Sequence, residues 1–185
     1  MSGRLPGSRL AAVLLFSTLA ACGGGGGGGG GGPTAPPPPP QPAIVFTSTG
    51  TSSANSVVLA SGTGSNATTL ILEVRAISVA DVYGVAFDLR YPSNLLQFVR
   101  ATPGGLLEAG SVQAAAAGEG NLVVGATRLG EVPGVTGSGT LLTLEFTALT
   151  AGDGTFSFAR NSALDPDARP LPGVNWAAGS VRIIR

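Results

Sequence analysis

The chain has 185 residues, with ten basic and ten acidic side chains, no His and a single Cys. This balanced charge provides no basic surface for nucleic acid. The absence of His excludes His-based nucleophilic catalysis and the commonest zinc sites, and one Cys cannot form an intramolecular disulfide.

Residues 1–21 have the features of a bacterial signal peptide. A positive N-terminal region is followed by LAAVLLF (Leu10–Phe16), an apolar segment too short to span a bilayer. Leu19–Cys22 then resembles the lipobox of bacterial lipoproteins, in which the Cys is acylated and cleavage occurs just before it. We expect lipid on Cys22 to hold the protein on a membrane; an ordinary secretory signal or an uncleaved anchor is the alternative. By resemblance to Gram-negative lipoproteins, Gly23 favours the outer membrane of the cell envelope.

Residues 22–42 have the composition of a tether. Ten consecutive glycines, Gly23–Gly32, precede a Pro-rich segment that ends at Pro42. Glycine loses much backbone entropy on ordering, and a proline run favours an extended polyproline II conformation, so we expect a disordered spacer with a stiffer tip. A phosphate-binding loop needs spaced glycines, a Lys and a following helix, which this sequence does not provide. A proline-motif ligand for another protein is a further alternative.

Residues 43–185 have the length of one ordinary domain. Three strands are predicted to open it: Ile44–Thr47, Ser56–Ala60 and Thr69–Ile77. The clearest alternation follows in VYGVAFDLRY, Val82–Tyr91, which predicts a half-buried strand that ends before Pro92. Its apolar face would hold Tyr83, Val85, Phe87, Leu89 and Tyr91, and its outward face Gly84, Ala86, Asp88 and Arg90.

The rest of the domain is also predicted to consist of short strands. These are Leu95–Ala101, Val112–Ala117, Asn121–Leu129, Thr140–Leu149, Thr155–Ala159 and Val174–Ile184. Four alanines make helix the alternative for the second of them. Glu131–Gly139 and Asp165–Pro172 are predicted loops, and Asp153-Gly154 a hairpin turn. Strands at this spacing, with Gly and Pro turns and no long helix, indicate an all-β antiparallel sandwich.

Five side chains outside the Val82–Tyr91 strand are candidates for function. Asp165 and Asp167 could form a calcium loop, a catalytic carboxylate pair or a solvated turn. Trp176 could stack on a sugar ring or pack in the core or at a sheet edge. Arg128 and Glu131 could contact a partner or be ordinary surface charges. Because no acid, base and nucleophile converge, we expect no catalytic residues and no enzyme.

The Val82–Tyr91 strand, with Leu95, Leu96 and Phe98 after it, resembles the corresponding segment of cohesin domains, the receptor modules that bind dockerins in cellulosomes. Further similar segments are Pro103–Leu107, Leu122–Arg128 and Val135–Phe146, the last resembling the family's Gly-x-Gly-x-Leu-x-x-Ile-x-Phe strand. The resemblance covers about residues 57–184. It implies a nine-stranded jelly-roll β-sandwich, an architecture shared with carbohydrate-binding modules.

The resemblance also implies a function. A non-catalytic module would bind a dockerin-type protein partner, with a link to polysaccharide degradation. Cohesins carry polar side chains on one sheet face, including a carboxylate or amide on the outward side of this strand, where the chain instead has Gly84 and Ala86 before Asp88 and Arg90. No metal or cofactor is implied, because the calcium of such a pair belongs to the dockerin. A carbohydrate-binding domain that uses Trp176, or a purely structural envelope domain, is the alternative.

Overall fold

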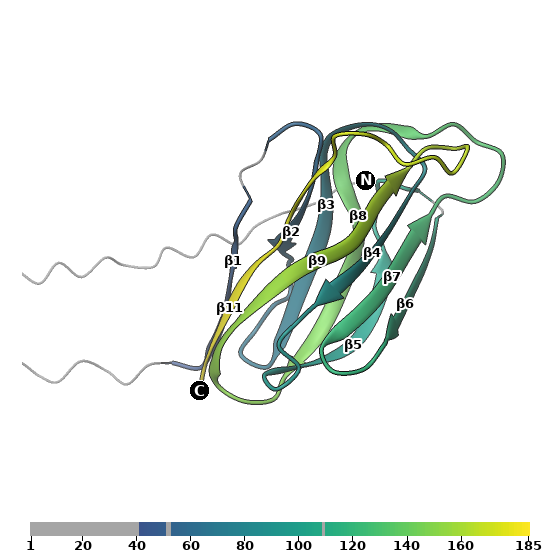
Figure 1. The fold of residues 1–185 in the computed structure, drawn as a ribbon. Coiled ribbons are helices and arrows are strands. Elements are labelled where there is room, and N and C mark those ends of the chain that lie inside the picture. The colour runs from purple at the N-terminus through teal and green to yellow at the C-terminus, as the bar shows by residue number, and fades with distance from the viewer. Residues whose placement is uncertain (1–40, 51–52, 109) are drawn as a thin grey trace, which may run out of the picture. The chain divides into compact units, whose positions relative to one another are not determined.

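The computed structural model describes residues 41–50, 53–108 and 110–185 (Figure 1). The predicted signal peptide, Cys22 and nearly all of the tether lie outside these residues. The segment from Pro38 to Arg185 forms a compact unit of its own. Within the described ranges, no helix has the length and apolar character needed to cross a membrane.

The described part of the chain contains eleven strands and no helix. They are β1 (Ala43–Ser48), β2 (Ser56–Ser61), β3 (Thr69–Val82), β4 (Gly84–Arg90), β5 (Leu96–Pro103), β6 (Ser111–Ala116), β7 (Asn121–Thr127), β8 (Val135–Ala148), β9 (Gly152–Leu164), β10 (Asn175–Ala177) and β11 (Gly179–Ile184). The alanine-rich segment is therefore a strand, as predicted, and not a helix.

The strands form a sandwich of two sheets (Figure 1). One sheet has the order β1-β11-β9-β4-β7-β6 and the other the order β10-β2-β3-β8-β5. The first and last strands of the domain pair with each other, with Ala43 opposite Ile184. The predicted all-β sandwich is confirmed, but the strand count is eleven and not nine, and the β10–β2 pair is parallel. The segment expected to form one final strand is divided at Ala178 between the two sheets.

The apolar side of β4 lies against the opposite sheet, as its alternation predicts. Val85, Phe87 and Leu89 are each at most 2 % exposed, and they belong to one core cluster with the inward residues of β3 and β8. Phe146 on β8 is at the centre of the aromatic contacts. Its ring centroid lies 5.2 Å from that of Tyr91, 5.7 Å from Phe98 and 5.8 Å from Phe156. Both sheets thus meet at this ring.

Two predictions of non-strand structure are wrong. Asp153 and Gly154 do not form a turn but lie inside β9, opposite Arg182 and Val181 of β11. A Cβ on Gly154 would come within 2.5 Å of Pro92 Cγ, so Gly is required there for close packing. The expected loop up to Gly139 is also partly strand, because β8 begins at Val135 and pairs with β3 through successive bulges. In both places glycine permits close approach between segments.

We expect Phe146→Ala to lower the free energy of unfolding by about 3 to 5 kcal/mol, because a large buried side chain leaves a cavity between the sheets. Urea denaturation of the unit from Pro38 to Arg185 measures this change. Val99→Ala is the matched control, since Val99 is 48 % exposed, and should change the value by under about 0.5 kcal/mol. Equal effects of the two substitutions would contradict the placement of Phe146 at the centre of the core.

Candidate binding face

The outer side of four neighbouring strands forms a continuous surface, which we call the β4 face. Strand β4 lies between β7 and β9, and β6 completes the surface beyond β7. Ala86 lies opposite Gly125 and Ser162, and Asp88 lies opposite Val123 and Ala159. The residues of the face are Ala86, Asp88, Arg90, Gln113, Ala115, Val123, Gly125, Ala159, Arg160 and Ser162. Five of these ten residues are Ala, Gly or Ser, and the surface around Ala86, Gly125 and Ser162 is therefore flat.

One ion pair crosses the middle of this face. Asp88 points away from the core but is only 5 % exposed, because Arg160 covers it. Arg160 Nε donates a hydrogen bond to Asp88 Oδ2 at 2.8 Å, and Nη2 donates to the same oxygen. The Arg160 side chain stays 76 % exposed. The pair therefore presents a guanidinium to solvent over a buried carboxylate.

A bulge in β9 places Arg160 over β4. The register between β4 and β9 shifts between Ala86 and Asp88, and Arg160 has a φ of 47°. This left-handed conformation is uncommon for a residue other than Gly, and bulges of this kind redirect a side chain. Here the redirected side chain is the one that covers Asp88.

The four predicted outward residues of β4 differ in exposure. Ala86 and Arg90 are exposed, whereas Gly84 and Asp88 are buried. A Cβ on Gly84 would lie 3.0 Å from the carbonyl oxygen of Ala126, so any larger residue there requires its neighbours to move by a few tenths of an ångström. Only two of the four residues are therefore accessible to a partner without rearrangement.

Arg128 and Glu131 are not part of the β4 face. Arg128 donates from Nη1 to the carbonyl of Pro133 at 2.8 Å, and its Nη2 pairs with Glu108 Oε2 at 2.5 Å. Its side chain is 13 % exposed. Arg128 therefore stabilises the loop between β7 and β8, and Glu131 is exposed in that loop.

Trp176 packs at the sheet edge. It lies on β10, and its ring centroid is 5.0 Å from that of Phe158 and 5.6 Å from that of Phe87. An open hollow of about 470 Å³ beside it is also lined by the polar residues Thr49, Ser157 and Asn161. Trp176 therefore contacts the core rings from the sheet edge and also borders a hollow whose polar lining was not predicted.

The acidic pair after β9 forms a closed turn. Asp165 Oδ1 accepts a hydrogen bond from the backbone N–H of Arg169 at 2.8 Å, and Asp167 pairs with the Arg169 guanidinium at 2.7 Å. Among the described residues, no three His, Cys, Asp or Glu side chains are grouped to hold a metal ion. The contacts of both carboxylates are those of a turn stabilised by its own arginine.

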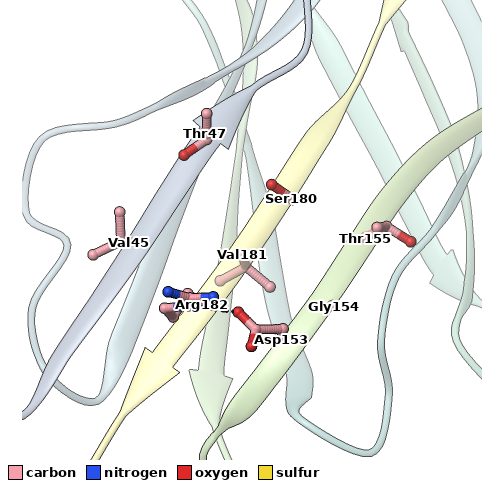
Figure 2. A pocket seen from close by; sticks show the side chains of 8 residues that line it. All are labelled: Val45, Thr47, Asp153, Gly154, Thr155, Ser180, Val181 and Arg182. Atoms are coloured by element: carbon pink, nitrogen blue, oxygen red, sulfur yellow. Dashed lines mark hydrogen bonds and ion pairs between the residues drawn. The ribbon is translucent and has the colours of Figure 1, made fainter.

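Another groove lies on the sheet that contains β4, over its strands β1, β11 and β9 (Figure 2). Its volume is about 530 Å³, and its lining includes the hydroxyls of Thr47, Thr155 and Ser180. Arg182 and Asp153 face each other in it, with Nε and Oδ1 2.6 Å apart. This carboxylate raises the pKa of the exposed Arg182 guanidinium. The two charged groups of the groove therefore satisfy each other.

A smaller hollow opens at the end of the β4 face. Its volume is about 200 Å³, and Gly84 and Gly125 contribute to it from the sheet. Leu164, Pro166 and Ala168, from the end of β9 and the loop after it, form another part of its lining. The sequence gives no signal for this hollow, because the segments that form it meet only in the folded sheet.

Comparison with known proteins identifies the family. The family model for the cohesin domain matches residues 46–183. No curated protein sequence is similar enough to count as a relative. A non-cellulosomal cohesin from the archaeon Archaeoglobus fulgidus has a TM-score of 0.52 and 16 % identity, over 74 % of this chain and 88 % of that one.

Two further solved structures are similar. The second type II cohesin module of the ScaA scaffoldin from Acetivibrio cellulolyticus has a TM-score of 0.53 and 16 % identity, over 75 % of this chain and 95 % of that one. The cohesin of the Coh-OlpC–Doc435 complex from Clostridium thermocellum has a TM-score of 0.51 and 12 % identity, over 60 % and 83 %. At these identities the structures show a shared fold. Together with the family match over most of the domain, they show that the chain belongs to the cohesin domain family.

Proposed function

We propose that this protein is a non-catalytic, lipid-anchored cohesin module that binds a dockerin-type protein partner on its β4 face. The observation that carries the proposal is the cohesin match over residues 46–183. Solved structures of similar fold include type I cohesin–dockerin and type II cohesin–X-dockerin complexes. A shared fold does not determine function, so the chain's own surface must also suit a protein partner.

The β4 face has the properties of a protein-docking surface. It is flat because Ala86, Gly125 and Ala159 are small, and Val123 adds an apolar side chain that is 42 % exposed. Arg90 and Arg160 add exposed charge. A flat face of mixed polarity suits contact with another protein. Through such a partner, we place the protein in polysaccharide degradation at the outer membrane of a Gram-negative cell.

Capture from a lysate of the source organism, with and without a calcium chelator, tests the partner. We expect the unit from Pro38 to Arg185 to retain a protein with a dockerin-type repeat only when calcium is present. The purified module from that protein should bind the unit directly in titration calorimetry. Failure to retain any dockerin-type protein under either condition would contradict the proposed partner.

Ala86→Arg tests the surface. Ala86 is exposed between Gly125 and Ser162, so an Arg there would project from the flat face and weaken binding of the captured module by about tenfold or more. Thr147→Arg is the matched control, because Thr147 is exposed on β8 of the opposite sheet, and should change the dissociation constant less than about twofold. Equal binding by both variants would place the docking surface elsewhere.

The anchor has its own test at Cys22. We expect Cys22→Ser to abolish incorporation of labelled fatty acid and to release the protein from the membrane fraction, because acyl chains supply the membrane affinity. Fractionation of cells that express the full chain measures both effects. Unlabelled wild-type protein, or a Cys22→Ser variant that stays in the membrane fraction, would contradict lipid anchoring.

Carbohydrate binding is the second candidate, favoured by the polar hollow beside Trp176. If the protein binds a protein partner and no sugar, wild-type protein should migrate equally in native gels with and without plant polysaccharides. Retardation that Asn161→Ala removes would favour the sugar site instead. Asn161 is the informative position because it lines the hollow, whereas Trp176→Ala would also remove the ring contacts with Phe87 and Phe158.

A further inference from the structure

We infer that the β4 face selects its partner through two fixed features. The hollow at Gly125 receives one aliphatic side chain, and the Arg160 guanidinium receives one carboxylate. This inference rests on the proposed function, because it requires a protein partner on this face. It adds the chemistry that the partner must present.

The hollow suits an aliphatic side chain. Its volume of about 200 Å³ is several times the roughly 30 Å³ that one water molecule occupies in the liquid. Leu164, Pro166 and Ala168 give its lining an apolar character, and the lining carboxylate of Asp165 accepts a hydrogen bond from the backbone of Arg169. A Cβ built on Gly125 would meet no atom within 4 Å. The space above this glycine is therefore open to a side chain from outside.

Arg160 is held ready for an anion. Two of its N–H groups point to Asp88 Oδ2, and a guanidinium has five donors. Among the described residues, no hydrogen bond of Arg160 Nη1 is present. Asp88 fixes the side chain in place, so a partner carboxylate would bind it at a low cost in side-chain entropy. Asp88 offsets the charge of Arg160, but the exposed N–H groups of the guanidinium can still donate to both oxygens of a partner carboxylate, which a neutral acceptor does not match.

The backbone sets the spacing between the two features. Two residues of the hollow give its position along β4. Gly125 lies opposite Ala86, which is two residues before Asp88, and Gly84 is four residues before Asp88. At about 3.3 Å per residue, the hollow and the ion pair are roughly 7 to 13 Å apart. The surface between them is made by Ala86 and Ser162, which leaves room for close approach. A partner helix with an aliphatic and an acidic residue about five to nine residues apart on one face would match this spacing, at about 1.5 Å per residue.

Gly125→Leu tests the hollow. We expect the filled hollow to raise the dissociation constant of the captured dockerin-type module by about tenfold or more, because the partner's side chain loses its site. Gly105→Leu is the matched control, because a Cβ there also meets nothing within 4 Å and Gly105 lies in the loop between β5 and β6. The control should bind within about twofold of wild type.

A double substitution tests the ion pair. Asp88→Asn with Arg160→Gln removes both charges together, so no buried carboxylate is left unpaired. We expect binding about tenfold weaker and a smaller dependence of the dissociation constant on salt. Asp153→Asn with Arg182→Gln is the control, since it removes an exposed Asp–Arg ion pair between β9 and β11, away from the β4 face. Circular dichroism and thermal melts show whether each variant is folded.

The outcomes separate this inference from the proposed function. If the captured module binds wild type, Gly125→Leu and the Asp88–Arg160 double variant within twofold, the inference is overturned and the proposed function stands. If no dockerin-type module binds the wild type, the proposed function fails and this inference fails with it. Selective loss of binding in both face variants, with both controls unchanged, establishes the two contacts.

Discussion

The apolar side of β4 is the constraint on which the rest of the fold depends. Val85, Phe87 and Leu89 are buried against the opposite sheet, while β7 and β9 pair with β4 on its two edges. A shift of one residue would turn these side chains into solvent, so the register with both neighbours is fixed. The same register determines which residues point outward. The composition of the β4 face is therefore a consequence of how the core is packed.

Much of the sandwich could be predicted because strands with one buried face keep a period of two in the sequence. β4 shows this clearly, because Val85, Phe87 and Leu89 are buried as expected, and the second half of β8 has the same alternation. Glycine caused the two wrong predictions of non-strand structure. At Gly154 it permits close packing against Pro92, yet in a sequence it reads as a turn. The Asp88–Arg160 pair could not be predicted either, because its members are 72 residues apart and meet only through a bulge.

The family and the surface of this chain carry different information. Membership follows from the family-model match over residues 46–183, while the sandwich itself is shared at identities near 16 %. The outward positions of β4 do not pack in the core and are free to differ, and here they include Gly84 and Ala86. The β4 face has a hollow at one end and the Asp88 carboxylate covered by Arg160. Differences at such outward positions leave the packing of the core intact, so one fold can carry different surfaces.

The pairing of β1 with β11 has a mechanical consequence for an anchored protein. Six consecutive residue pairs, from Ala43–Ile184 to Ser48–Gly179, join the first strand to the last. If the anchor lies before Ala43 and a partner holds the β4 face, tension enters the domain through β1 and must cross this ladder to reach β9 and β4. The backbone hydrogen bonds between β1 and β11 then resist the pull together with the side chains of Ile44 and Phe46, which pack against the core.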